Sequence, residues 1–214
     1  MSILITGANR GIGAGLRAGY AARGDDVHGT ARAAADGLLA LDVTDPASVA
    51  ALAATWGDRP VDLLVCNAGV YPDKGQSLDD GYPAEMWATG LATNVTGVFL
   101  TIQALLPQLR AARGKIAIIS SQMASQELAP GGSYIYRASK AAALNLGRNL
   151  AKDLRGDGVA VGIYHPGWVR TDMGGDSAAI SVDEAARGLI ARFDALSVAT
   201  TGVFETWDGR PHPF

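Results

Sequence analysis

Short apolar runs alternate with longer segments of helical period along the chain, and Gly, Pro, Asn or Asp separates most of them. This alternation is typical of strand–helix–strand units, in which helices connect parallel strands. All but the last of the apolar runs are suited to burial on both faces, as a parallel sheet requires. The runs predict strands at residues 2–6, 26–30, 38–41, 61–67, 115–120, 159–164 and 202–205.

Helix signals fill the intervals between these strands. Asp45 before Pro46 predicts an N-cap followed by proline at the first helical position, for a helix that ends at about Trp56. Ser181 and Glu184 form a capping-box pattern ahead of another apolar helical segment. Both patterns indicate helices that begin at defined residues.

Two longer helical segments are predicted at about residues 83–110 and 136–155, whereas residues 71–82, rich in Gly, Asp and Pro, are expected to be irregular. Neither a linker nor an internal repeat interrupts the pattern. We therefore expect a single domain over residues 1–214. Its predicted fold is α/β and doubly wound (Rossmann), with a mostly parallel sheet of about seven strands and helices on both faces.

A glycine-rich turn follows the first predicted strand. The segment TGANRGIG, residues 6–13, places Gly7, Gly11 and Gly13 ahead of a helix, in the spacing G-x-x-x-G-x-G. Such glycines allow a tight turn and let a pyrophosphate approach the positive end of the helix. A simple turn is the alternative, but the position in a strand–helix–strand series favours a dinucleotide site.

Tyr136 and Lys140 lie four residues apart and therefore on one face of a helix. An ammonium group beside a phenol lowers the pKa of a tyrosine, so that the side chain can act as an acid or a base near neutral pH. A solvated Tyr–Lys pair on the surface is the alternative that this spacing leaves open.

Composition narrows the possible partners. The formal net charge is −3 and no Lys/Arg cluster occurs, so we expect neither nucleic-acid nor membrane binding. The longest uncharged run, residues 86–109, contains too many polar side chains for a membrane span. The three histidines lie far apart with no carboxylate or cysteine at ligand spacing, so no metal site is expected.

Cys66 is the only cysteine, which excludes a disulfide within the chain. Its apolar surroundings predict an inert, buried thiol. The first residues also lack the pattern of a signal peptide. We therefore expect a cytoplasmic location.

Together, the glycine turn and the sequence YRASK at residues 136–140 resemble the short-chain dehydrogenase/reductase superfamily, in its compact single-domain branch. The resemblance spans nearly the whole chain, and its motifs follow the predicted strands in order. The stretches GGSYIYRASKAAALN, HPGWVRTDMGG and GVFETWDGR resemble the C-factor and carbonyl-reductase-like subgroup. Further matching motifs are Leu41-Asp42-Val43, Asn67-Ala68-Gly69, Asn94 within NVTG, Ser120-Ser121 and Pro166-Gly167.

This resemblance implies a catalytic tetrad of Asn94, Ser121, Tyr136 and Lys140. Tyr136 would give its proton to the substrate carbonyl oxygen during reduction, and Ser121 would hold that oxygen by a hydrogen bond. Lys140 would bind the nicotinamide ribose and lower the pKa of Tyr136. Asn94 would bind the water that links Lys140 to solvent. The hydride would come from the nicotinamide.

The sequence departs from the family in the spacing between the serine and the tyrosine. Ser121 precedes Tyr136 by 15 positions, so the loop at residues 122–133 is expected to have gained residues. Ser120 is a rival of Ser121, and Tyr134 is a rival of Tyr136. The family motif selects the second serine after the strand and the tyrosine four residues before the lysine.

A second departure is the short segment after Thr171, which implies an open and permissive substrate pocket. Trp168, directly after Pro166-Gly167, is a candidate for lining that pocket.

The end of the second predicted strand bears on the choice of cofactor. Enzymes that use NAD place an Asp or Glu there, which repels a 2′-phosphate. This chain has Ala31 where the family's acidic residue is expected, and Arg32 follows it, while Arg10 approaches from the glycine turn. Two arginines suit a phosphate, although solvated surface charges are the alternative. We therefore expect NADP(H) in preference to NAD(H).

Taken together, these motifs predict which residues contact the cofactor, and none of them is expected to bind a metal. The expected cofactor-binding residues are Gly7, Asn9, Arg10, Gly11, Ile12, Gly13, Arg32, Asp42, Val43, Asn67, Ala68, Gly69, Tyr136, Lys140, Pro166, Gly167, Val169 and Thr171.

The expected activity is NADP(H)-dependent hydride transfer between nicotinamide and a small-molecule carbonyl or secondary alcohol. A catalytically idle, dinucleotide-binding signalling or regulatory protein is one alternative, because the C-factor name denotes signalling. An alcohol oxidiser that uses NAD is another. The resemblance also implies a homodimer, because the helices that contain Asn94 and follow Tyr136 pair across a two-fold axis in many members of the family.

Overall fold

Seven parallel strands form one sheet in the structure, a computed structural model that describes residues 1–214. Their spatial order is β3-β2-β1-β4-β5-β6-β7. The chain therefore starts in the middle of the sheet, builds one half outward to β3, and then crosses back to build the other half. The predicted doubly wound α/β fold is confirmed. The strands are β1 (Ser2–Ile5), β2 (Asp26–Ala31), β3 (Leu39–Ala40), β4 (Leu63–Cys66), β5 (Lys115–Ile119), β6 (Ala160–His165) and β7 (Phe204–Thr206).

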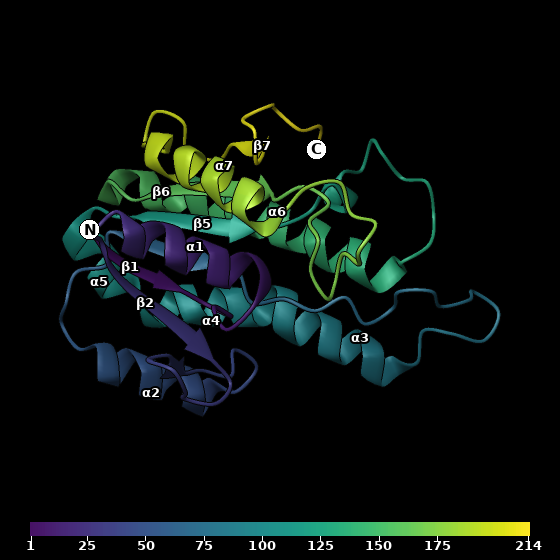
Figure 1. Cartoon of the computed structure of the whole chain (residues 1–214), viewed down its shortest axis with the longest axis horizontal. Coiled ribbons are helices and arrows are strands. Elements are labelled where there is room, and N and C mark those ends of the chain that lie inside the picture. Colours follow the sequence, from purple (N-terminus) through teal and green to yellow (C-terminus); the bar gives the residue numbers. More distant parts are fainter.

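Helices cover both faces of this sheet. On one face, α1 (Gly11–Ala22) lies beside α7 (Val182–Ala195) (Figure 1). The other face carries α2 (Pro46–Trp56), α4 (Gly97–Ala104) and α6 (Tyr134–Leu154). Each face has its own hydrophobic core, because successive strand residues point to opposite sides. Ile3 and Ile5 therefore pack under α1 and α7, whereas Leu4 packs in the core on the opposite face.

The outer strands correct one expectation about burial. Strands β1, β4, β5 and β6 are almost wholly buried, as predicted. Burial of β2 and β3 on both faces is wrong: Asp26 and Ala40 are exposed, and β3 has only two residues. For β3 the cause is position, because it is an edge strand with no neighbour on its outer side, whereas Asp26 is the first residue of the internal strand β2.

The helix predicted over residues 83–110 is not continuous. It consists of α3 (Ala84–Leu91), the π-helical turn η1 (Ala92–Thr96), α4 and α5 (Leu106–Ala112). The axis bends by 60° before α5, where Pro107 lies in the first turn. Proline has no backbone N–H and ends a helix in this way. No single helix has the length and apolar composition to span a membrane, although this bent pair taken together passes that test.

The predicted helix starts are confirmed. Asp45 caps α2 by accepting a hydrogen bond from the Ala47 N–H (2.9 Å). The Ser181 hydroxyl caps α7 by accepting from the Glu184 N–H (3.2 Å). Residues 71–82 contain neither helix nor strand, as expected. Two 3₁₀ turns, η2 (Gln122–Ala124) and η3 (Arg155–Asp157), complete the fold.

Candidate active site

The predicted site segments follow four neighbouring strands of the sheet. Residues 6–13 follow β1, residues 67–69 follow β4, residues 120–121 follow β5 and residues 166–171 follow β6. Because parallel strands end at the same edge, these segments gather at the carboxyl edge of the sheet. This edge, at the change of winding direction, is the usual ligand site of open α/β sheets.

The glycine turn leaves space and N–H groups for an anion. Gly7 and Gly11 have φ of 65° and 53°, in the left-handed region that favours glycine. A Cβ at Gly13 would clash with the Gly7 carbonyl oxygen and lie 2.6 Å from the Asn67 side-chain nitrogen. No side chain caps α1, since Arg10 at its N-cap makes no such hydrogen bond. The chain therefore fits a pyrophosphate at the start of α1.

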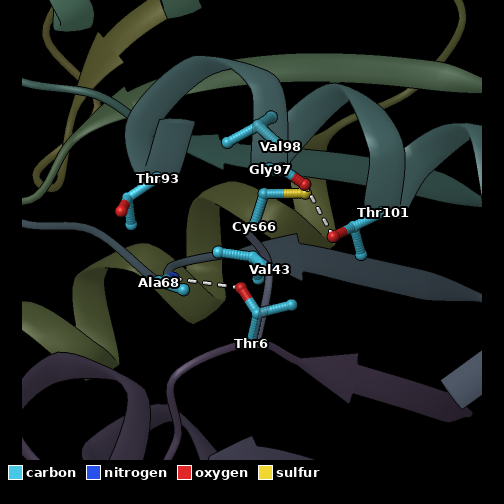
Figure 2. Close-up of a pocket in the computed structure, with 8 residues that line it drawn as sticks. All are labelled: Thr6, Val43, Cys66, Ala68, Thr93, Gly97, Val98 and Thr101. Atoms are coloured by element: carbon cyan, nitrogen blue, oxygen red, sulfur yellow. Dashed lines mark hydrogen bonds between the residues drawn. The ribbon is translucent and has the colours of Figure 1, made fainter. Parts of the chain in front are cut away.

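Hydrogen bonds hold this turn against the segment after β4. Asn67 Nδ2 donates to the carbonyl oxygens of Thr6 (2.9 Å) and Gly7 (3.0 Å). The Thr6 hydroxyl accepts from the backbone N–H groups of Asn67 and Ala68, both at 3.0 Å. Figure 2 shows Thr6, Ala68 and Val43 around a narrow gap under α4, which is too small to hold a water molecule. Two of the expected cofactor residues, Val43 and Ala68, thus lie together.

Tyr136 lies in the first turn of α6 with 8% of its surface exposed. Its ring stacks on Tyr71, with centroids 4.2 Å apart and planes inclined by 18°. Burial raises the pKa of Tyr136 to about 12, while a hydrogen bond with the Ser121 hydroxyl lowers it in part. The expected lowering of this pKa is wrong: burial raises the pKa, and the nearby Tyr71 and Asp73 raise it further.

Lys140 is buried one turn further along α6. Its Nζ donates to the Ile119 carbonyl oxygen (2.9 Å) and lies 5.6 Å from the centre of the Tyr136 ring. Burial lowers the pKa of Lys140 to about 8. The predicted placement of phenol and amine on one helix face is confirmed.

Asn94 is fixed by the π-helical turn η1. Its Oδ1 accepts from the Val70 N–H, and its Nδ2 donates to the Val70 carbonyl and to Ser139 Oγ, all at 2.9 Å. A Cβ at Gly69 would lie 3.2 Å from Asn94 Oδ1 and 3.4 Å from Lys140 Nζ. Asn94 Oδ1 and Lys140 Nζ therefore both lie next to Gly69. Single π-helical turns are frequent at functional sites.

The two rival residues have other partners. Ser120 is buried and its hydroxyl donates to the Lys140 carbonyl oxygen (3.0 Å). Tyr134 is exposed and meets the Tyr82 ring edge-on. Ser121 and Tyr136 are favoured over these rivals, because the Ser121 hydroxyl acts on the pKa of the Tyr136 phenol.

The segment after β6 returns to the glycine turn. A Cβ at Gly11 would lie 3.3 Å from the methyl group of Thr171, whose hydroxyl accepts from the Gly174 N–H (3.1 Å). Trp168 is 51% exposed, and its Nε1 donates to the Gly174 carbonyl oxygen (2.9 Å). Thr171 thus lies against the turn, while Trp168 lies at the surface.

The two predicted phosphate-binding arginines have different surroundings. Arg32 is exposed and lies near Asp42, whose pKa is lowered mainly by hydrogen bonds from Thr44 and in part by the Arg32 charge. Arg10 forms an exposed ion pair with Asp172 (2.6 Å). Asp172 is a partner that sequence reasoning missed, because 162 residues separate the two side chains.

Sequence reasoning also missed Tyr71 and Asp73. Asp73 has no exposed surface and accepts hydrogen bonds from the N–H groups of Ile135 (2.8 Å) and Tyr136 (3.2 Å). The only available signal was an aspartate in an irregular segment, because Ser133 before the helix is itself a residue type common at N-caps. That signal does not identify a contact across more than 60 residues.

The winding of the sheet and the glycine turn at its carboxyl edge define a doubly wound α/β protein of the dinucleotide-binding class. Comparison with known sequences makes the assignment specific. Residues 1–180 match the family described as short chain dehydrogenase, and the chain belongs to this family. It is therefore an oxidoreductase, and the predicted resemblance is confirmed.

Two relatives illustrate the range of the family. The chain is 36% identical over 224 residues to 1-hydroxy-2-glutathionyl-2-methyl-3-butene dehydrogenase of Rhodococcus sp. strain AD45, covering 97% of each protein. It is 37% identical over 157 residues to the C-signal of Myxococcus xanthus, covering 72% of this chain and 93% of that protein.

Solved structures of carbonyl reductases share the whole fold. The carbonyl reductase Sniffer of D. melanogaster superposes with a TM-score of 0.93 at 27% identity, covering 100% of this chain and 99% of that one. The NADPH-bound carbonyl reductase from chicken fatty liver gives 0.89 at 30% identity, covering 100% and 98%. The carbonyl-reductase-like subgroup expected from the sequence is supported by both.

Proposed function

We propose that this oxidoreductase reduces small-molecule carbonyl compounds with NADPH. The proposal rests on one observation: the side chains of Tyr136, Ser121 and Lys140 lie close together, beside a glycine turn that fits a dinucleotide. The names of the carbonyl reductases with the same fold support it.

The cofactor would lie along the carboxyl edge of the sheet. The N–H groups at the start of α1 would hold its pyrophosphate, and Lys140 with residues 67–69 and 166–171 would hold its nicotinamide half. When bound, the nicotinamide dinucleotide supplies a hydride.

The proton would come from Tyr136. A phenol with a pKa of about 12 is neutral throughout the neutral range and has a proton to give. Ser121 would hold the carbonyl oxygen beside that phenol, so that the oxygen receives the proton while the carbonyl carbon receives the hydride. Lys140 would orient the ribose and, as an ammonium group below about pH 8, stabilise negative charge that develops on the oxygen. Asn94 would bind a water that connects Lys140 with solvent.

NADP(H) would be preferred because the end of β2 lacks an acidic side chain. Ala31 ends the strand, and Arg32 next to it carries the positive charge that a 2′-phosphate needs. NADPH or NADP is named in the descriptions of several structures with the same fold, which supports this preference.

A signalling role is the second candidate function, favoured by the similarity to the C-signal of Myxococcus xanthus. Alcohol oxidation with NAD would use the same catalytic residues, and only the contacts with the adenosine ribose of the cofactor would differ.

The test is NADPH consumption with a panel of aldehydes and ketones, followed by a comparison with NADH. Turnover with NADPH on at least one carbonyl supports the proposal. Tight NADPH binding without turnover on any of them favours signalling.

We also propose that the chain works as one domain in a cytoplasmic homodimer. Leu91 and Phe99, on the helical segments around Asn94, are exposed apolar side chains on the helices expected to pair. Sedimentation at micromolar concentration checks this, and a species of 22.0 kDa alone would contradict it.

A further inference from the structure

Asp73 is a fully buried carboxylate at the start of the helix that carries Tyr136. Its Oδ2 accepts from the Ile135 N–H (2.8 Å) and its Oδ1 from the Tyr136 N–H (3.2 Å). We propose that Asp73 is a positioning residue that fixes Tyr136 for proton transfer, acting as the N-cap of α6 from a segment 63 residues away. This inference rests on the proposed function of Tyr136.

The helix has no cap of its own. Ser133 occupies the N-cap position with φ of 49° and makes no side-chain hydrogen bond to the first turn. Its hydroxyl is instead bonded to the Tyr71 hydroxyl, with the two oxygens 2.5 Å apart. The backbone N–H groups that Ser133 leaves free are those that Asp73 binds.

The environment suits a buried carboxylate. Burial of a charged group is costly unless hydrogen bonds and opposite charge compensate it. Here two backbone N–H groups supply the hydrogen bonds. The N-terminus of α6, a helix of 21 residues, supplies the positive charge. Because Tyr136 itself donates one of these bonds, the contact fixes the backbone from which the phenol projects.

Neighbours of Asp73 contact the other candidate groups. The Asn94 side-chain amide hydrogen-bonds both the N–H and the carbonyl oxygen of Val70, and the Tyr71 ring stacks on Tyr136. Lys74 Nζ donates to the Met173 carbonyl oxygen (3.2 Å), in the segment after β6. We name residues 70–74 the anchor segment. A displaced Asp73 would therefore also shift the ring that packs on the phenol.

The test uses Asp73→Asn in the full chain. An asparagine oxygen still accepts from one N–H, while its amino group cannot accept from the other. We expect kcat to fall by roughly 10-fold to 100-fold, as for small misplacements of reacting groups, with NADPH affinity unchanged. Asp73→Ala, which removes both bonds, is expected to lose more activity.

The pH profile separates positioning from loss of fold. The groups that act on the Tyr136 phenol are Lys140 on α6, the Tyr71 ring, the Ser121 hydroxyl and the charge of Asp73, which binds the Tyr136 backbone. Asp73 and Tyr71 both raise the pKa of Tyr136. Removal of the Asp73 charge should therefore lower the pKa of Tyr136 and shift the rising kcat/KM profile of alcohol oxidation, which needs the phenolate, to lower pH; a purely structural defect would not do this.

Asp45→Asn is the matched control, since Asp45 caps α2, a helix without candidate site residues. It should keep the kcat of the wild type. Hydrogen exchange adds a readout without turnover: the Ile135 and Tyr136 amides should lose protection in Asp73→Asn only. Unchanged protection, or wild-type kcat and pH profile in Asp73→Asn, overturns the inference. Failure of the proposed function would instead appear as full turnover in Tyr136→Phe.

Discussion

At the scale of single residues, burial sets the protonation states of the site. Tyr136 loses the solvation that would stabilise a phenolate, and Lys140 loses the solvation that stabilises its ammonium group. The pKa of Tyr136 rises to about 12 and that of Lys140 falls to about 8. Near pH 7 the pair is thus a neutral phenol beside a cation, which is the arrangement that proton donation to a carbonyl requires.

Replacement of the phenol by a phenyl ring tests the proton donor. In Tyr136→Phe the stack on Tyr71 remains while the transferable proton is lost. We expect NADPH affinity near that of the wild type and turnover reduced by about 100-fold or more, the size typical of general acid catalysis. Lys140→Ala should weaken both binding and turnover. Steady-state kinetics and NADPH fluorescence measure the two effects, and equal loss of affinity in both variants would show that the roles are misassigned.

The raised pKa of Tyr136 also predicts a pH dependence that differs between the two directions. Reduction uses the phenol, which is present over the whole neutral range, so its kcat/KM should not rise with pH. Oxidation of the product alcohol needs the phenolate, whose fraction grows about tenfold per pH unit below the pKa. Profiles of kcat/KM between pH 6 and pH 9, roughly the physiological range and its margins, check this. A flat profile for oxidation would contradict the pKa assignment.

At the scale of elements, the site depends on how helices begin and where they are interrupted. The seven strands, to within two residues at each end, the glycine turn and the Tyr136–Lys140 face were predictable, because each follows from local periodicity or from spacing within a few residues. The π-helical turn at Asn94 was not, since its side-chain pattern resembles that of an ordinary helix. The Asp73 cap and the Arg10–Asp172 pair were not predictable either, because they join distant parts of the chain.

The glycine turn yields a prediction about cofactor binding. In Gly13→Ala the new methyl group would collide with the Gly7 carbonyl and the Asn67 side chain, so the turn must open. Overpacking of this kind costs about 1–3 kcal/mol, and we expect NADPH affinity to fall by roughly tenfold or more. Gly156→Ala is the control, because no atom lies within 4 Å of its added methyl group. Equal NADPH affinities in the two variants would exclude the turn as a cofactor site.

At the scale of the whole molecule, the two halves of the sheet share the candidate cofactor site. The Arg10–Asp172 ion pair connects the turn after β1 with the segment after β6. Arg10 therefore has two possible anionic partners, the Asp172 carboxylate and the 2′-phosphate of NADPH. An exposed pair of this kind is worth roughly 0–1 kcal/mol, so the competition is modest.

Removal of that competitor should favour NADPH. We expect Asp172→Asn to lower the KM for NADPH by up to about fivefold, the equivalent of 1 kcal/mol, and to leave the KM for NADH unchanged. Asp157→Asn, which breaks the Arg110 pair elsewhere on the surface, is the control. An equal effect on both cofactors would show that Arg10 does not contact the phosphate.

Arg32, directly after β2, allows a second test of the preference for NADPH. In Arg32→Ala the preference of kcat/KM for NADPH over NADH should fall by about tenfold or more, because a hydrogen bond to a charged group contributes about 1.5–3 kcal/mol. A wild-type preference for NADH would contradict the cofactor assignment outright.

The anchor segment also limits how the substrate range of this protein can be engineered. Residues 71–82 form one irregular segment, which invites exchange as a single cassette with the corresponding segment of a relative. Such a graft would remove Tyr71 and Asp73 together with the rest of the loop. A chimera joined after Lys74 keeps the stack on Tyr136 and the cap of α6, whereas one joined after Val70 discards both. The useful boundary for recombination therefore lies inside the loop, four residues from its start.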